Sequence, residues 1–275
     1  MNVYGEKLIN PWETSDYNSR VIGVYYVDRV KTVEVFNSRA PSNYYFESLH
    51  WSPDGNNISF LKNDNDTEEE TKSKKNKTDV ILVDKNFKYS HIYSYNLNYD
   101  SVTQITKGNF SVNNFDYSPK GERMIFSHQD DTNINTGFVN TDISLIESDG
   151  SNMKNIISRP GLDSNPIFSG DGNKFAFISS GGRQESIGLR DVYIYDLENQ
   201  KTIKLSDTPN RDSNIISWSS DNKMVIISEN VNTTSQVIML PVNGNRYISW
   251  SYNCLLYTSD AADEGLGVDL GGRRI

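Results

Sequence analysis

One short motif occurs four times in this chain. WSPDG at 51–55 returns as YSPKG at 117–121, FSGDG at 168–172 and WSSDN at 218–222. An apolar run follows every copy: NISFL, RMIFS, KFAFI and MVIIS. The aromatic residues that open the copies are 66, 51 and 50 residues apart, which is close to the length of one four-stranded blade of a β-propeller. The repeat therefore predicts consecutive sheets of similar build.

The residue types of the motif predict a hairpin. The aromatic residue ends one strand and packs against a neighbouring sheet, and Pro fixes φ at the first central position of the turn. Gly supplies the positive φ with which the chain reverses into the next strand. In the fourth copy Asn222 stands in place of Gly, and Asn enters the left-handed region more readily than most residues.

A second strand pair follows each hairpin. SHIYSYNLNYDSVTQIT, TDISLIESDGSNMKNII, RDVYIYDLENQKTIKLS and SQVIMLPVNGNRYIS alternate with period two and then turn at Asn, Asp or Gly. About four strands per unit result. We therefore predict an all-β fold, a partial β-propeller of about four to five blades with TolB-like repeats, in which 21–46 is the remnant of an additional blade.

The net charge of −9 disfavours nucleic acid and anionic membrane surfaces as partners, because both require a basic patch. No apolar run is long enough to span a bilayer, and the first residues lack the order of a signal peptide. We predict neither nucleic-acid nor membrane partners. The localisation stays open, with a periplasmic or secreted parent as one alternative.

The segment NDNDTEEETKSKKNK at 63–77 lengthens the first repeat. Asp64, Asp66 and Glu68 are oxygen donors, but the run lacks the glycine and the terminal glutamate of a calcium loop. Acidic residues followed by lysines, with no hydrophobic residue among them, favour a solvated and mobile loop between strands. We therefore predict no metal site there.

No catalytic constellation is recognisable. The sequence has no G-x-S-x-G elbow, no H-E-x-x-H pair and no phosphate loop. His50, His91 and His128 are predicted to lie at strand ends rather than to act as bases, because a catalytic base needs a partnered nucleophile. The motif aspartates, Asp54, Asp171 and Asp221, are predicted to form turns. We predict no catalytic, cofactor-binding or metal-binding residue, and no cofactor.

Residues 85–250 resemble the N-terminal β-propeller of prolyl oligopeptidase family serine peptidases, in particular the dipeptidyl and acylaminoacyl peptidase branches. The resemblance rests on SHIYSYNL, FDYSPKGERMIFSHQ, NTDISLIESDG, DSNPIFSGDGNKFAFISS and RDVYIYDL in that order. WSPDG alone is less specific, since TolB propellers share it.

The resemblance implies a propeller of seven or eight blades that covers a C-terminal α/β-hydrolase domain and admits small peptides. The implied partners are that hydrolase domain and a peptide substrate. None of the family's Ser, Asp and His has a counterpart here, so the chain itself is not expected to be an enzyme. Two alternatives stay open: a TolB-like interaction scaffold and, with less support, a propeller hydrolase that uses carboxylates.

The last 22 residues differ in composition from the rest. CLLYTSDAADE at 254–264 and VDLGGRRI at 268–275 resemble, in frame, the translation of both constant parts of a transposase sequencing adapter. We therefore expect 1–253 to be an incomplete propeller domain and 254–275 to be an artefact rather than a domain. On this view the parent protein continues beyond the chain, and Met1 is open as the true start.

Overall fold

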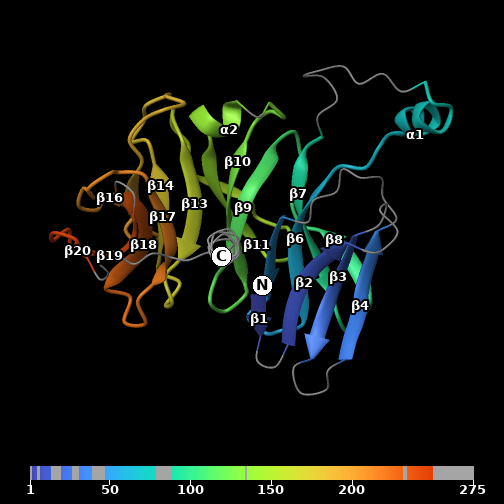
Figure 1. The fold of residues 1–275 in the computed structure, drawn as a ribbon, viewed down its shortest axis with the longest axis horizontal. Helices are drawn as coiled ribbons and strands as arrows, with labels where there is room; N and C mark the ends of the chain where they lie inside the picture. The colour runs from blue at the N-terminus through green and yellow to red at the C-terminus, as the bar shows by residue number, and fades with distance from the viewer. Residues whose placement is uncertain are drawn as a thin grey trace, which may run out of the picture.

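The computed structural model describes residues 2–4, 7–13, 20–26, 31–38, 47–78, 88–133, 135–231 and 234–249. Five four-stranded sheets follow one another along the chain, and every pairing within them is antiparallel (Figure 1). The strands are β1 (Asn2–Tyr4), β2 (Lys7–Glu13), β3 (Arg20–Tyr26) and β4 (Lys31–Ser38); β5 (Glu47–Trp51), β6 (Asn57–Asn63), β7 (Ser90–Asn96) and β8 (Ser101–Gln104); β9 (Ser111–Tyr117), β10 (Arg123–Gln129), β11 (Asp142–Glu147) and β12 (Lys154–Ile157); β13 (Asp163–Phe168), β14 (Lys174–Ser179), β15 (Asp191–Asp196) and β16 (Lys201–Lys204); β17 (Ser213–Trp218), β18 (Met224–Val231), β19 (Thr234–Pro241) and β20 (Ile248–Ser249).

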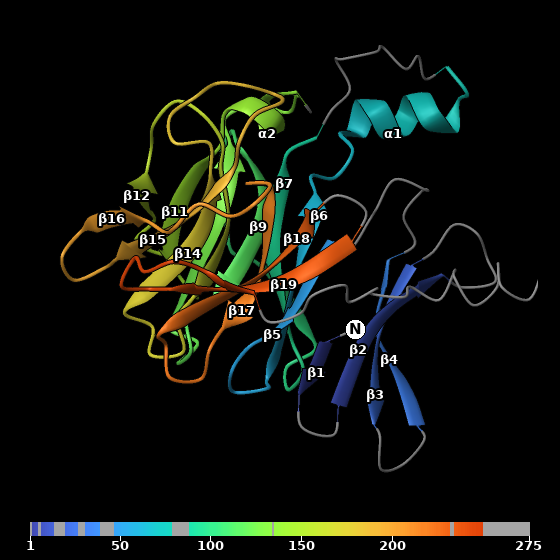
Figure 2. The ribbon, with the colours of Figure 1, turned by 60° about the vertical axis from the view of Figure 1, so that its left-hand side comes forward.

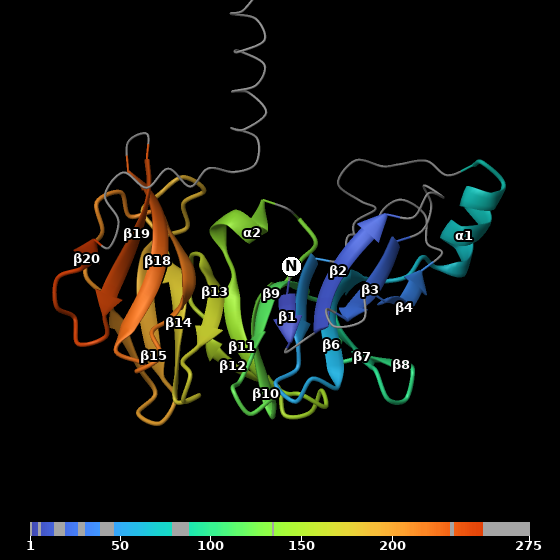
Figure 3. The ribbon, with the colours of Figure 1, turned by 60° about the horizontal axis from the view of Figure 1, so that its bottom comes forward.

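Each sheet is a meander, in which strands that are adjacent in sequence are adjacent in space. The first strands of neighbouring sheets, β1, β5, β9, β13 and β17, contact one another in turn. They therefore form the inner row of an arc, and the fourth strands form the outer row (Figure 3). Among the described residues the sheets do not close into a ring, so the predicted all-β partial propeller of four to five blades is confirmed.

The predicted remnant at 21–46 is larger than expected. Its two strands, β3 and β4, belong to a complete four-stranded sheet that begins at Asn2. The sequence did not predict it because no copy of the turn motif lies in this part of the chain.

The turns behave as the motif predicts. Gly55, Gly121, Gly172 and Asn222 have φ between 58° and 75°, a region that L side chains other than Asn rarely enter. Space is also limited, because a Cβ on Gly121 would lie 3.1 Å from Cδ of Pro53 in the preceding copy. The turns of successive sheets thus pack directly against each other.

The core lies between neighbouring sheets and not on one side of them. One cluster gathers Ile125, Ile143, Phe168, Phe175 and Phe177 between the β9–β12 and β13–β16 sheets. Strands β10 and β14 are buried along almost their whole length, because a sheet on each side covers both faces. This packing explains why their sequences are continuous apolar runs rather than alternating ones.

The prediction of a mobile loop at 63–77 is wrong in one respect. Residues Glu68–Lys75 form a helix, α1, and Thr67 caps it in a reciprocal capping box with Glu70. Acidic residues fill the first turn and lysines the last, the distribution that the helix dipole favours. No residue of α1 is buried, and the helix stands clear of the sheets, as predicted for a solvated segment (Figure 2).

Between 88 and 249 the described residues contain a single four-residue helix, α2 (Thr136–Val139). Neither helix has the length and apolar character needed to cross a bilayer.

Candidate functional site

The motif aspartates are turn formers, as predicted. In the turns of Asp54, Asp171 and Asp221 the Ser hydroxyl two residues earlier donates to the carboxylate, at 2.5, 2.6 and 2.7 Å. The backbone N–H two residues later donates to the same oxygen. The serine hydrogen bond is the main reason why the pKa of each aspartate lies below its ordinary value. These carboxylates are therefore unsuited to act as general acids.

His128 belongs to an arrangement that has the composition of a catalytic triad. Its Nε2 lies 2.9 Å from Oγ of Ser144, and its Nδ1 lies 3.9 Å from Oδ1 of Asp130. Ser144 donates to Oδ1 of Asn155, so Nε2 has to be the donor toward Ser144 and cannot accept its proton. Ser144 is fully buried, and 3.9 Å is too long for a hydrogen bond. The group therefore stabilises the sheet and cannot generate a nucleophile.

All three histidines lie one residue from an end of their strand, as predicted: His50 in β5, His91 in β7 and His128 in β10. β10 continues to Gln129 because a register shift between Ser127 and His128 maintains its pairing with β9. Burial lowers the pKa of His50 to about 4 and also lowers the pKa of both other histidines. Buried neutral imidazoles of this kind are packing residues.

The acidic side chains at the start of the 63–77 segment do not converge. Asp66 pairs with Lys74 at 2.7 Å, and Asp64 lies 3.9 Å from Nε2 of His91. Within the described ranges no three His, Cys, Asp or Glu side chains come together as ligands of a metal ion.

The inner row of strands carries a chain of side-chain amides that the sequence analysis missed. Ser127 donates to Oδ1 of Asn114 at 2.6 Å, and Nδ2 of Asn114 donates to Oδ1 of Asn165, also at 2.6 Å. Nδ2 of Asn165 then donates to Oδ1 of Asn214 at 3.2 Å. The chain links β9, β13 and β17, one strand from each of three sheets. It is a polar wall on the inner side of the arc, and its hydrogen bonds fix the spacing of the sheets.

A sequence signal for this wall exists. Asn114 and Asn165 both lie three residues before the motif aromatic, and Asn214 lies four residues before Trp218. Asn165 also has φ of 56°, a conformation that Asn tolerates better than most residues. The recurrence is visible only when the copies are aligned by their aromatic residue.

Ion pairs hold two of the connections from the outer strand of one sheet to the inner strand of the next, β12–β13 and β16–β17. Arg159 makes two hydrogen bonds to the buried carboxylate of Asp163, at 3.0 and 2.8 Å. Arg211 makes two to Asp191, at 2.7 and 2.6 Å, and Lys204 lies 3.0 Å from the same carboxylate. Two parallel bonds fix orientation as well as distance, so the connections are rigid.

The environments of the two carboxylates differ. Burial raises the pKa of Asp163, and the hydrogen bonds from Arg159 and Ser179 oppose this without cancelling it. Burial also acts to raise the pKa of Asp191, but the hydrogen bonds from Arg211 and Lys204 outweigh it, so that this pKa lies below its ordinary value.

Exposed apolar side chains lie on the loops at the same end of the sheets. Phe138 in α2 is 50% exposed, and Ile187 and Leu189 in the β14–β15 loop are 93% and 44% exposed. Nε2 of Gln184 lies 3.4 Å from Oδ1 of Asn140, so the two loops are neighbours. The turn motifs occupy the opposite end (Figure 1).

No protein-family model matches the chain. Dipeptidyl-peptidase 5 of Aspergillus fumigatus is 25% identical to it over 143 residues, which are 48% of this chain and 20% of that protein. Dipeptidyl-peptidase 5 of Trichophyton tonsurans is 21% identical over 140 residues, 47% of this chain and 19% of that protein. The matched region is thus about a fifth of the length of these curated relatives.

Solved structures match the fold over nearly the whole chain. TolB from Acinetobacter baumannii superposes with a TM-score of 0.61 at 17% identity, covering 90% of this chain and 53% of TolB. A structure from a study of two prolyl endopeptidases gives the same TM-score at 13% identity, covering 90% of this chain and 34% of that one. The chain therefore has the fold of TolB-like and peptidase propellers, and in sequence it resembles a dipeptidyl-peptidase.

Proposed function

We propose that this chain is part of the propeller of a serine peptidase and that it controls which peptides reach a hydrolase domain elsewhere in the parent protein. The observation that carries the proposal is the sequence match to dipeptidyl-peptidase 5 over nearly half of this chain.

The inner amide wall supports a filtering role. An access path that selects by size needs a wall whose width does not fluctuate, and three hydrogen-bonded inner strands provide one. The ion-paired connections restrict movement of one sheet relative to the next. Peptide amides would meet donors and acceptors of their own kind along this wall.

The hydrolase domain is expected to contact the end of the sheets that carries α2 and the β14–β15 loop. The chain enters each inner strand and leaves each outer strand at this end of the sheets. A domain joined before or after the propeller is therefore connected to it at this end. Phe138, Ile187 and Leu189 supply exposed apolar surface at this end, which favours burial against a partner.

The filtering role is tested in the full-length parent with Asn165→Gly. Glycine tolerates the positive φ of this position and removes only the amide that joins β13 to β9 and β17. We expect kcat/KM for a peptide of about 30 residues to rise several-fold relative to that for a dipeptide reporter, whose own kcat/KM stays unchanged. The matched control is Asn245→Gly in an exposed turn between β19 and β20.

An unchanged ratio between the two substrates, in a variant that folds as the parent does, contradicts the filtering role. A fall in kcat/KM for both substrates together also counts against the filtering role. In that case Asn165 supports the structure of the catalytic unit and does not limit access to it.

A second candidate is a TolB-like interaction scaffold without any hydrolase. The superposition on TolB, which includes 90% of this chain, favours this candidate on the ground of the shared fold. The two candidates differ in what the parent gene encodes after its last blade.

A further inference from the structure

One row of residues across the β5–β8 sheet differs in kind from its equivalents. In each of the four sheets that carry the turn motif, the motif aromatic on the first strand pairs with a residue on the second strand. The row starts at the next residue of that second strand. In the β5–β8 sheet it consists of Ser59, Ser94 and Thr103. The equivalent rows are Ile125, Leu145 and Lys154; Ala176, Ile194 and Ile203; Ile226, Met239 and Ile248. Hydroxyl groups thus occupy all three positions of the row in this sheet, whereas the other three rows are apolar except for Lys154.

The polar row faces the neighbouring β9–β12 sheet. Oγ of Ser59 lies 2.7 Å from the hydroxyl oxygen of Tyr117, across the boundary between the two sheets. The next row toward the turns is polar as well, because Nδ2 of Asn96 donates to Oδ1 of Asn57 at 2.8 Å. At the following boundary the equivalent contact is apolar, with Phe168 packed in the same cluster as Ile125.

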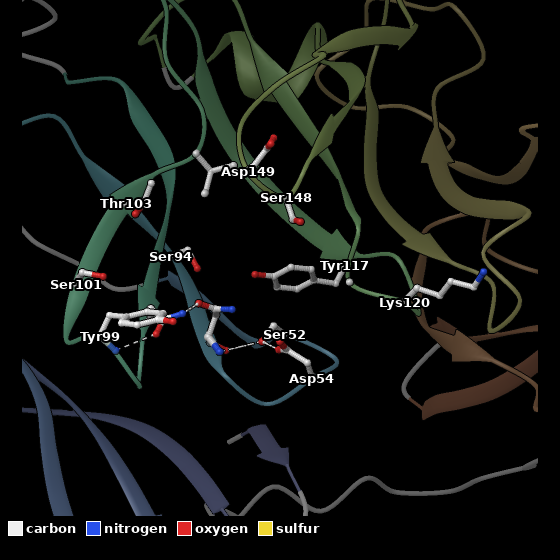
Figure 4. Close-up of a pocket in the computed structure, with 14 residues that line it drawn as sticks. Ser52, Asp54, Ser94, Tyr99, Ser101, Thr103, Tyr117, Lys120, Ser148 and Asp149 are labelled. Atoms are coloured by element: carbon white, nitrogen blue, oxygen red, sulfur yellow. Dashed lines mark hydrogen bonds between the residues drawn. The ribbon is translucent and has the colours of Figure 1, made fainter.

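Ser94 and Thr103 of the first row, with Asn57 and Asn96 of the second, form one wall of a cleft of about 480 Å³. Tyr117, Lys120, Ser148 and Asp149 line it from the β9–β12 side, and Figure 4 shows the hydroxyl of Tyr117 directed toward Ser94. The volume lies in the range of small-molecule sites, yet hydroxyl and amide groups dominate the lining instead of apolar side chains. An apolar ligand would leave these groups without partners.

Part of this polar lining is available to a ligand. In the described part of the chain the hydroxyls of Ser101, Thr103 and Ser148 make no hydrogen bonds, whereas Ser52 and Asn57 bond within the turn. Hydroxyls both donate and accept, which matches a ligand that itself carries several hydroxyl groups.

The charges of the cleft exclude anions. Asp54 and Asp149 lie on its lining, and hydrogen bonds from serine hydroxyls hold the pKa of each below the ordinary value, so both are ionised at neutral pH. An anionic ligand would meet two carboxylates, and Lys120, the one cationic residue of the lining, turns its ammonium group away from the hydroxyls (Figure 4).

The rim carries an aromatic platform. Tyr99 is 81% exposed at the tip of the β7–β8 turn, and Oδ1 of Asn96 accepts its backbone N–H at 3.1 Å, which fixes the turn. The equivalent residue in the β15–β16 turn is Asn199, whose N–H bonds to Asp196 in the same way. The β7–β8 turn thus carries a large exposed aromatic ring where the β15–β16 turn carries an amide. Such a ring can stack on the apolar face of a sugar.

We propose that the cleft between the β5–β8 and β9–β12 sheets binds an uncharged saccharide. The sugar hydroxyls bond to Ser101, Thr103 and Ser148, and the ring of Tyr99 covers one face of the sugar. A peptide fits less well, because hydroxyl and amide side chains dominate the lining and Ile105 is its single aliphatic side chain.

The test is ligand-observed NMR of this chain with maltose, cellobiose and lactose, followed by titration of the best binder. Glucuronate and the dipeptide Ala-Ala serve as the anionic and the peptide probe. We expect saturation transfer to at least one neutral disaccharide and weaker transfer to both other probes. Tyr99→Ala should raise Kd about three- to tenfold, the effect of losing one contact, and Thr103→Ile, which introduces the residue type of Ile203, should abolish binding.

Both positions are exposed, so the variants are expected to fold, which the amide spectrum checks. Asn199→Ala is the matched control and should leave Kd unchanged. Three outcomes overturn the proposal: no neutral disaccharide binds, the Tyr99 and Thr103 variants bind as tightly as the parent, or Ala-Ala or glucuronate binds more tightly than every disaccharide.

Discussion

The buried carboxyl group of Asp116 makes the stability of the contact between two sheets depend on pH. Its Oδ2 accepts the backbone N–H of Phe168 in the next sheet at 2.9 Å. Burial raises the pKa of this carboxyl to about 6, from a value near 3.8 in the unfolded chain. The folded state therefore binds more protons than the unfolded state between about pH 4 and pH 6, and stability falls as the pH rises through that window.

Asp116→Asn should remove this dependence, because the amide oxygen keeps the hydrogen bond and carries no charge. We expect the variant to be more stable than the parent by about 1–3 kcal/mol at pH 8, where the upper value corresponds to about two pKa units. At pH 4 the two proteins should be nearly equal. Urea unfolding at both pH values measures the difference. The control is Glu198→Gln in an exposed turn, and parallel pH profiles for parent and Asp116→Asn contradict the account.

At the scale of elements, the sequence predicted the recurring hairpins and missed the side-chain contacts that join one sheet to the next. Gly55 and its equivalents located four hairpins, because a positive φ restricts the residue type at that position. The hydroxyl row that starts at Ser59 escaped detection, because its meaning depends on which strand lies beside it and on the sheet opposite. The hydrophobic periodicity of the sequence identifies neither the neighbouring strand nor the sheet opposite. The inner asparagines escaped for the same reason, since their partners lie in other sheets.

Helix α1 was missed although its signals are local. Thr67 and Glu70 form the S/T-x-x-E box, but the helix is short and buries nothing, so no apolar periodicity marks it. Thr67→Ala should increase amide exchange at 70–75 about fivefold, the effect of losing a cap worth about 1 kcal/mol. The urea midpoint should not change, because α1 packs against no core.

The control for α1 is Thr71→Ala, an exposed substitution inside the helix that leaves the cap intact. It should preserve or improve amide protection. Equal exchange rates in the parent and in Thr67→Ala would show that the capping box does not hold the helix.

At the scale of the whole molecule, the described residues form an arc of sheets in which amides join three inner strands, β9, β13 and β17, and ion pairs hold two of the connections between sheets. The predicted adapter origin of 254–275 and the domain boundary at 253 stay predictions, because 250–275 lie outside the described residues. The proposed peptidase, with its hydrolase domain and further blades, depends on the likeness to dipeptidyl-peptidase 5, of which the match spans one fifth.

The most direct test of the central proposal is the sequence of the parent gene beyond codon 253, determined from genomic DNA. We expect two or three more blades of about 40 to 50 residues each, which would bring the five observed sheets to seven or eight, followed by an α/β-hydrolase domain. That domain should carry a G-x-S-x-G elbow, with an Asp and then a His after it in the chain. A reading frame that closes the propeller and stops without such a domain contradicts the peptidase proposal and favours the interaction scaffold.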